Sequence, residues 1–324
     1  MANYKELDVF IAQAKGEVDS KSVEVANARK VMKALAARYI DTKDKSIRTE
    51  LAQITTELTS TILREKVNYI DLFADVKRTA IDVKANFKFE RDLTSAEMGA
   101  KGVAGDRGTV TNDFKGMETS FVSTRPFISF LDMASGRLNF DRIAQLSAEK
   151  MDRVIAKSLE DTMFNAFSVM SAPNYGTGTG IDQTILKSQI NTFGRFGAVS
   201  LLGDIETLGK LDTVSGWTSK LPESLALDLN ANGYIGTFNT ASVIKMTNPL
   251  LTGSMTETNL RKDLLYVLCS GDEGRRSLKV QFEGDLIMRE HEDFETGDYE
   301  MLMGQIFGSA VVGAEHYMGV YRAQ

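Results

Sequence analysis

The residues best suited to metal or acid–base chemistry cluster near the C-terminal end of the chain. His291, one of only two histidines, lies within an acidic run made of Glu290, Glu292, Asp293, Glu295, Asp298 and Glu300. Carboxylates and an imidazole bind divalent cations, so the run is a candidate metal centre for a hydrolase. It lacks both the HExxH pair and the DxDxDG loop, and a strand over residues 286–292 would place Glu290 and His291 on opposite faces. We therefore interpret the run as a solvated turn and expect no metal site.

Two further features invite a chemical interpretation. Gly176, Gly178 and Gly180 resemble a phosphate-binding loop, but they follow a predicted long helix and lack the lysine of a P-loop. They predict a loop at the exit of that helix. Cys269, the only cysteine, lies in the apolar segment LLYVLCSG, so we expect a buried, unreactive thiol. Because these motifs supply no set of nucleophile, base and orienting group, we predict no enzymatic activity and no cofactor.

Length and composition limit the class of protein. A chain of 324 residues, 43% of them hydrophobic, can bury a large core and form two domains or one elaborated domain. Its net charge of -6 argues against a dedicated nucleic-acid binder. The polar start ANYKELD and the lack of an apolar run of about 20 residues predict neither a signal peptide nor a membrane span, so we expect synthesis in the cytosol.

Helical spacing dominates the first 80 residues. Apolar residues recur at intervals of three and four, as at Leu7, Phe10 and Ile11, and predict two or three helices with breaks near Gly16 and residues 40–46. Basic side chains concentrate here. They are interpreted as a solvated helix face, and the alternative is an arm that faces packaged nucleic acid. The candidates for that arm are Arg29, Lys30, Lys33 and Arg38.

A change of period at Val83 predicts the first strand. One face of this strand is formed by Val83, Ala85, Phe87 and Phe89. A glycine-rich stretch and a second extended segment follow, so residues 83–124 are predicted to form a long hairpin with a flexible tip.

The longest predicted helix spans residues 139–170, with Asn139 or Asp141 as its N-cap. Its predicted buried stripe consists of Ile143, Leu146, Val154, Leu159, Met163, Phe167 and Met170. Residues 185–250 alternate between helix and strand and predict an inserted unit, after which apolar strands close the chain. The expected fold class is therefore α+β.

This order of elements resembles the major capsid protein of tailed bacteriophages, which has the Hong Kong ninety-seven phage fold. The segments most similar to that family are TRPFISFLDMASGRLNFDRIAQLSAEKMDRVIAKSLEDTMFNAF and the closing GSAVVGAEHYMGVYR. The resemblance implies an N-terminal helical arm over residues 1–82 and an E-loop over residues 83–124. It also implies a peripheral domain over residues 125–183 and 247–324, with its spine helix at 139–170, and an axial domain over residues 184–246.

The resemblance further implies a non-enzymatic subunit that assembles into hexamers and pentamers of an icosahedral phage head around double-stranded DNA. Expected partners are a portal protein, a decoration protein, and DNA bound without sequence specificity. Retention of the arm is expected, and it implies either a separate scaffolding protein or none. The expected location is the virion, after assembly in the host cytoplasm and without a membrane. The E-loop residues that would contact neighbouring copies are Lys84, Phe87, Phe89, Arg91, Lys101, Arg107 and Lys115.

Some members of that family join neighbouring subunits covalently, through an E-loop lysine and a C-terminal asparagine. Lys101 and Lys115 are available, but Asn259 is the last asparagine, so no covalent cross-link is expected. Three alternatives stay open: an encapsulin-like cargo shell, whose N-terminal region is typically shorter; a metal-dependent hydrolase around His291, testable with Glu292→Ala; and a tail or baseplate component.

Overall fold

The computed structural model describes most of the chain, namely residues 5–14, 17–92, 110–167, 170, 173–215, 217–218, 234–251, 253–292 and 299–323. The chain divides into two compact units. The first consists of Met1–Asn68, Ser120–Ile155 and Glu283–Phe307, and the second of Tyr69–Thr119, Ala156–Phe282 and Gly308–Gln324. Helices and sheets occur together in these units, so the α+β class is confirmed.

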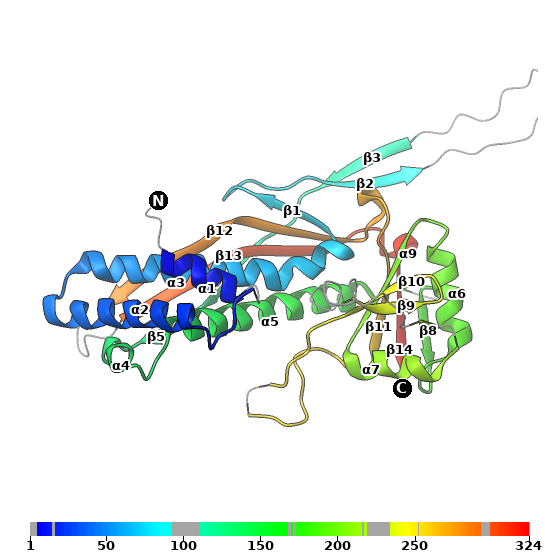
Figure 1. Ribbon diagram of the computed structural model, residues 1–324. Helices are drawn as coiled ribbons and strands as arrows, with labels where there is room; N and C mark the ends of the chain where they lie inside the picture. The colour runs from blue at the N-terminus through cyan, green and yellow to red at the C-terminus, as the bar shows by residue number, and fades with distance from the viewer. Residues whose placement is uncertain are drawn as a thin grey trace, which may run out of the picture. The chain divides into compact units, whose positions relative to one another are not determined.

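The first unit begins with three helices, α1 (Lys5–Ala14), α2 (Val23–Thr42) and α3 (Lys45–Val67). Ser22 and Asp44 are the N-caps of α2 and α3, since their side chains accept hydrogen bonds from the backbone N–H groups of Val25 and Ser46. Lys43, with a φ of 54°, reverses the chain between α2 and α3 (Figure 1). The predicted N-terminal helices are confirmed.

A sheet forms the other layer of the first unit. It contains β4 (Ser120–Thr124), β5 (Phe127–Ile128) and parts of the long strands β12 (Leu278–Glu292) and β13 (Tyr299–Val311). β13 pairs antiparallel with both β4 and β5. Gly304 in β13 must lack a side chain, because a Cβ there would lie 2.1 Å from the Phe121 ring. Helix α3 contacts this sheet where the Thr56 hydroxyl donates to the sulfur of Met288 at 2.9 Å.

The predicted long helix is present as α5 (Phe140–Phe167), preceded by the short α4 (Phe130–Ser135). Its predicted buried stripe is only partly right. Ile143, Leu159 and Met163 are buried, but Leu146 and Val154 are 39% and 50% exposed. The buried face also includes Ala144, Ala148, Met151 and Ile155, which were not predicted. Alanines line it because they permit neighbouring elements to approach closely, which a search for large apolar residues does not detect.

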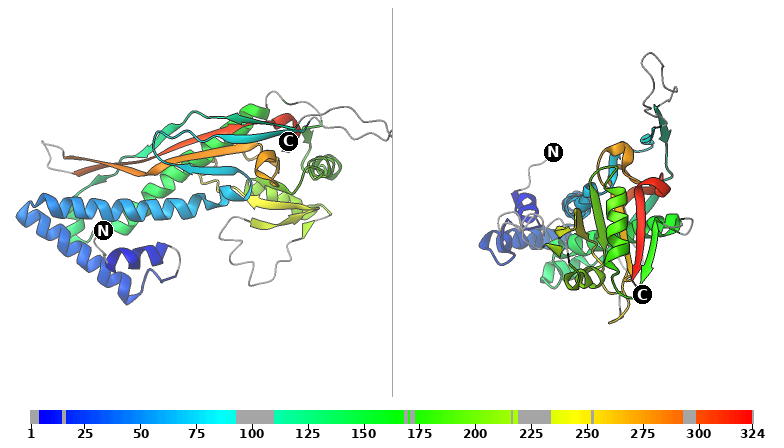
Figure 2. Two further views of the ribbon diagram at one scale, coloured as in Figure 1. Left: turned by 90° about the horizontal axis from the view of Figure 1, so that it is seen from above. Right: turned by 90° about the vertical axis from the view of Figure 1, so that its right-hand side faces the viewer.

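The second unit is built on a mixed seven-stranded sheet in the order β6-β14-β11-β7-β10-β9-β8. Its strands are β6 (Tyr175–Gly178), β7 (Val199–Gly203), β8 (Trp217–Thr218), β9 (Tyr234–Phe238), β10 (Ala241–Lys245), β11 (Leu264–Cys269) and β14 (Met318–Ala323). Its helices are α6 (Gln183–Phe193), α7 (Ile205–Gly209) and α9 (Ala314–Tyr317), with 3₁₀ turns η1 (Asn68–Leu72), η2 (Lys210–Thr213) and η3 (Glu273–Arg275). Figure 2 shows α6 beside the sheet, and Leu186 and Ile190 of this helix are fully buried with Leu201, Val267 and Tyr321.

The sheet extends beyond the predicted axial range at both ends, because it also includes β6, β11 and β14. The loop predicted at Gly176 and Gly178 is wrong, since these residues form β6, which pairs in parallel with β14. A Cβ at Gly176 would lie 2.5 Å from Ile185, and one at Gly178 would lie 2.6 Å from the Tyr321 hydroxyl. The glycines therefore serve close packing of a strand, which local sequence does not reveal.

The predicted hairpin is present as β2 (Phe87–Asp92) and β3 (Val110–Lys115), an antiparallel pair that runs from Phe87↔Lys115 to Asp92↔Val110. Its predicted tip lies outside the described residues. The strand begins four residues later than predicted, and Val83 is 51% exposed. A further strand, β1 (Asp75–Thr79), lies where helical spacing was predicted, and β4 belongs to the sheet of β13. These differences arise because strand partners, and not local period, fix strand ends.

Candidate assembly surfaces

The root of the β2–β3 hairpin is anchored by two aromatic rings. Phe87 is 2% exposed and packs with Ala85 and Met117. Phe89 is 5% exposed and packs with Cys269 and Tyr317. This corrects their prediction as inter-subunit residues, because rings that are buried within one chain hold the hairpin in place and are not available to a neighbour.

The remaining predicted hairpin residues fall into two groups. Lys84 is exposed, as a contact residue requires. The structure describes only the backbone of Arg91 and Lys115, while Lys101 and Arg107 lie outside the described residues. Exposure makes Lys84 available to a neighbour, and its role, like those of the other four residues, stays a prediction.

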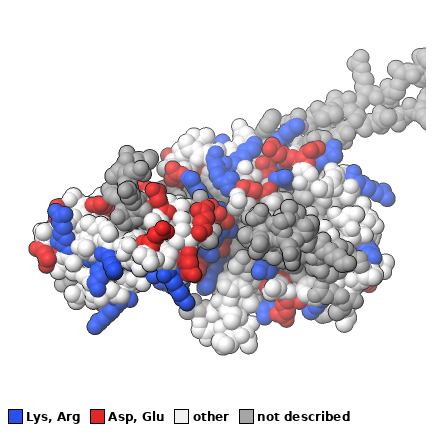
Figure 3. All heavy atoms as spheres, in the orientation of Figure 1, with Lys and Arg blue, Asp and Glu red and all other residues white. Residues whose placement is uncertain are grey.

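The four basic residues predicted for the N-terminal arm lie on α2. Arg29 forms an ion pair with the buried Asp141 at 2.5 Å, and the Lys33 ammonium donates to the Ser135 carbonyl at 3.3 Å. These two side chains join α2 to the α4–α5 region of the first unit. The spacing of residues in the sequence does not predict this contact. Lys30 and Arg38 are exposed. Among described residues, the face drawn in Figure 3 shows basic and acidic side chains interspersed, without one continuous basic area.

A buried carboxylate in the first unit gives a pH-dependent prediction. Asp152 is 6% exposed, and its Oδ1 has no hydrogen-bond partner among the described residues. Burial raises the pKa of this carboxyl from 3.8 to about 6, with Lys66 and Arg153 opposing the rise and Glu149 adding to it. Because the folded pKa exceeds the unfolded one, the contribution of Asp152 to stability is full below about pH 4 and is lost as the pH rises through about 6.

An Asp152→Asn variant of the subunit is therefore expected to be more stable than the parent at pH 7 by up to about 3 kcal/mol, since each pKa unit is worth about 1.4 kcal/mol. Its stability is also expected to vary less between pH 4 and pH 7. Urea unfolding followed by helical circular dichroism at several pH values measures both effects. Asp285→Asn, at an exposed carboxylate of β12, is the matched control and should leave the profile unchanged. A destabilised Asp152→Asn variant at pH 7 would contradict this assignment.

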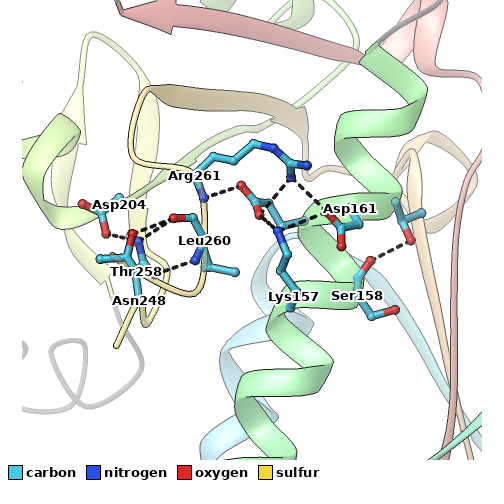
Figure 4. A network of polar contacts seen from close by, with 10 residues as sticks. Lys157, Ser158, Asp161, Asp204, Asn248, Thr258, Leu260 and Arg261 are labelled. Atoms are coloured by element: carbon cyan, nitrogen blue, oxygen red, sulfur yellow. Dashed lines mark hydrogen bonds and ion pairs between the residues drawn. The ribbon is translucent and has the colours of Figure 1, made fainter. Parts of the chain in front are cut away.

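A polar network in the second unit holds the segment between β10 and β11 against α5 (Figure 4). Glu160 is 1% exposed. Its carboxylate accepts from the Arg261 backbone N–H at 2.8 Å and pairs with the Arg261 guanidinium at 3.1 Å and with Lys157 at 3.2 Å. The same guanidinium pairs with Asp161 at 3.0 Å and lies 3.9 Å from the centre of the Phe164 ring. Arg261 is thereby fixed from several directions.

Asn248 holds the two ends of this segment together through side-chain hydrogen bonds. Its amide donates to Asp204 at 2.7 Å and to the Leu260 carbonyl at 3.1 Å, and it accepts from the Leu260 N–H at 2.7 Å (Figure 4). One side chain thus satisfies both backbone groups of a residue twelve positions away. Sequence reasoning did not identify Asn248, Glu160 or Arg261, because their partners are distant in the chain.

A buried amide holds the turn between β1 and β2, residues 80–86. The Gln281 amide, fully buried in β12, donates to the Val83 carbonyl at 2.9 Å and accepts from the Ala85 N–H at 3.2 Å. Nearby, Lys279 and Asp75 form a buried ion pair at 2.9 Å, although burial lowers the pKa of the lysine. The turn therefore has a fixed backbone.

The residues first considered for chemistry have structural roles or lie outside the described residues. Burial raises the pKa of the Cys269 thiol, in agreement with a buried cysteine. In the acidic run, Glu290 pairs with Arg48 and Glu300 with Arg125, while residues 293–298 and the His291 side chain are not described. No group of three metal-binding side chains occurs among the described residues. Within those same ranges, no helix has the length and apolar character needed to cross a bilayer.

Solved structures show which fold the chain has. The capsid of Ralstonia phage GP4 matches with a TM-score of 0.51 and 10% identity, over 79% of this chain and 89% of its own. The capsid of an empty GTA particle matches with a TM-score of 0.51 and 11% identity, over the same shares. The SrpI encapsulin from Synechococcus elongatus PCC 7942 matches with a TM-score of 0.51 and 10% identity, over 78% of this chain and 85% of its own. The chain thus has the fold of phage major capsid proteins, as the sequence predicted.

The family follows from the sequence. Residues 5–322 match the model of the family described as "SPbeta prophage-derived putative capsid protein YonB", and the chain belongs to this capsid protein family. It is a major capsid protein, a structural component of the virion that assembles with copies of itself. A search of curated proteins found no significant match.

Proposed function

We propose that this capsid protein forms the hexamers and pentamers of an icosahedral phage head that encloses double-stranded DNA. The observation that carries the proposal is the β2–β3 hairpin, which forms a two-stranded sheet separate from the other two sheets of the described residues. A two-stranded hairpin has little stability alone in water. Its root is buried within the chain. In our proposal the part beyond the root contacts another subunit.

The proposal also assigns surfaces and partners. In our proposal the hairpin is the E-loop, α5 is the spine helix of a peripheral domain, and the seven-stranded sheet forms the core of the axial domain. The N-terminal helices form an arm in which Lys30 and Arg38 face the DNA, because Arg29 and Lys33 are already engaged within the chain. DNA would be held through its phosphates, without sequence specificity. A portal, a separate scaffolding protein and a decoration protein complete the partners, with assembly in the host cytoplasm.

The experiment that tests this function removes the tip of the hairpin. A chain lacking residues 94–108, with β2 and β3 joined by a short glycine linker, is expected to fold but to yield at least tenfold fewer closed shells than the parent. The reason is that the root anchored by Phe87 and Phe89 stays intact while the reach to a neighbour is lost. Negative-stain electron microscopy, with and without a scaffolding partner, counts the shells, and nuclease-protected DNA in purified heads tests the cargo.

Three outcomes would change the proposal. Shells at the parental yield from the deletion would refute the role of the hairpin. Shells that carry a protein cargo and form without a portal or DNA would favour an encapsulin-like container, whose members share the fold. A parent chain that never forms shells would refute the head itself.

A further inference from the structure

The loop of residues 249–259 exposes apolar side chains in the second unit. Leu250 and Leu251 are 43% and 42% exposed, and Met255 is 87% exposed. Together they place three large apolar side chains on one short loop, which Figure 1 shows projecting away from the seven-stranded sheet. Exposed apolar groups gathered in this way are typical of protein-binding surfaces.

Backbone hydrogen bonds hold the described residues of this loop, 249–251 and 253–259, within the single chain. The Leu251 N–H donates to the Glu257 carbonyl at 2.8 Å, and the Asn259 N–H donates to the Pro249 carbonyl at 3.0 Å. The Ser254 hydroxyl accepts from the Glu257 N–H at 2.9 Å. At its base the loop is fixed by Asn248 and Arg261. Docking of such a preorganised loop costs little conformational entropy.

The β1–β2 turn has the same combination of order and exposure. Ile81 and Val83 are 48% and 51% exposed, and Lys84 beside them is exposed as well. Asp82 has a φ of 63°, and the Val83 N–H donates to the Ala80 carbonyl at 3.1 Å. Gln281 holds the turn from below, as described above.

These two elements lie on opposite sides of the second unit, the turn near the label β1 in the upper half of Figure 1 and the loop at the bottom. Subunits that close into a ring by head-to-tail contacts need two different surfaces that complement each other. The loop supplies apolar side chains with Glu257, and the turn supplies apolar side chains with Lys84. Neither charged group has an ion-pair partner among the described residues, so opposite charges remain available to steer the contact.

We propose that the 249–259 loop of one subunit docks on the β1–β2 turn of the next copy of this chain within each ring. The inference rests on the proposed function, since it requires ring formation. The contact joins Met255 to Ile81 and Val83, with Glu257 beside Lys84. This contact differs from the proposed hairpin contact because it uses the 249–259 loop and the β1–β2 turn and does not involve the hairpin tip.

A cysteine pair tests the contact directly. A Val83→Cys, Met255→Cys chain, assembled and oxidised with copper phenanthroline in air, is expected to give a ladder of disulfide-linked species up to the pentamer or hexamer on a non-reducing gel. Disulfides form only when the Cα atoms approach to about 4.4–6.8 Å, so the ladder is specific. The native Cys269 is buried and should not contribute. Controls are each single cysteine variant and the pair Val23→Cys, Met255→Cys, because Val23 is 75% exposed but lies outside the proposed contact.

A charge exchange gives an independent test. Lys84→Glu and Glu257→Lys are each expected to lower shell yield at low salt about five- to tenfold, while the double variant recovers the parental yield to within about twofold. Lys88→Glu combined with Glu257→Lys is the matched control and should not recover, because Lys88 is exposed on β2 outside the turn.

The outcomes separate this contact from the proposed function. Shells that form normally but give no ladder from the cysteine pair overturn the contact and leave the head intact. If the cysteine pair does not assemble, the charge exchange decides, and a double variant without recovery overturns the contact. A parent chain that forms no shells overturns the proposed function.

Discussion

A Glu160→Ala variant is expected to lower the free energy of unfolding of the second unit by about 3–5 kcal/mol, as for other buried ion pairs that lose one partner. The Glu160 carboxylate is almost fully buried and serves two cations and the Arg261 backbone N–H. Without it, the N–H is left in a desolvated site, and the guanidinium keeps only Asp161 and the Phe164 ring. The charge of Glu160 also adds to the burial that raises the pKa of Tyr266, so the variant should lower that pKa.

Urea unfolding followed by the fluorescence of Trp217, the only tryptophan, measures this loss, because β8 belongs to the sheet of the second unit. Asp161→Ala is the matched control. It removes a carboxylate from the next residue of the same helix, with the same guanidinium as partner, but this side chain is 42% exposed and its loss should be below about 1 kcal/mol. Glu160→Gln keeps an acceptor for the N–H and should lie between the two. Equal losses of unfolding free energy from Glu160→Ala and Asp161→Ala would show that the buried Glu160–Arg261 pair does not hold the segment between β10 and β11.

Truncation of Phe89 should have a comparable effect at the root of the hairpin. Phe89→Ala is expected to cost about 3–5 kcal/mol, the usual range for a buried phenylalanine. The ring centre lies 6.2 Å from that of Tyr317, and the ring occupies the space over Gly313. Because this ring fixes the direction in which the hairpin leaves the unit, shell yield should fall even in preparations where the subunit is folded.

The packing of Phe89 can also be tested by a substitution at Gly313. Gly313 has a φ of 63°, and a Cβ there would lie 2.3 Å from the Phe89 ring. Gly313→Ala is therefore expected to be destabilising through both backbone strain and displacement of the ring. Lys88→Ala, at the exposed neighbour of Phe89 on β2, should change stability by less than about 0.5 kcal/mol. If Phe89→Ala unfolds at the same urea concentration as Lys88→Ala, the ring does not anchor the hairpin.

The elements that depend on neighbours along the chain could be predicted from the sequence. The spacing of Leu51, Ile54 and Leu58 predicts α3, and these residues are buried on one face. The uninterrupted run after Asn139 predicts α5, and the apolar segment around Leu265 predicts β11. Buried and exposed residues alternate every few positions along a helix or strand, so a short stretch of sequence is enough to predict which of the two it forms. The order of these elements was sufficient to indicate the capsid fold.

The residues that organise the assembly surfaces were decided by tertiary structure. Phe89 has a strand pattern that suits a contact with a neighbour equally well, and only its packing against Gly313 shows that it is an anchor. Asn174 donates to the Met318 carbonyl across 144 positions, and Gln281 accepts from Ala85 across 196. Such pairings satisfy buried polar groups from distant parts of the chain. Local periodicity and element order were enough to predict the main helices, several strands and the class of protein, but not β1 or β6. Only the tertiary structure shows which side chains anchor the hairpin, which hold the ends of loops and which are exposed. These roles depend on contacts between residues far apart in the sequence, which local spacing does not encode.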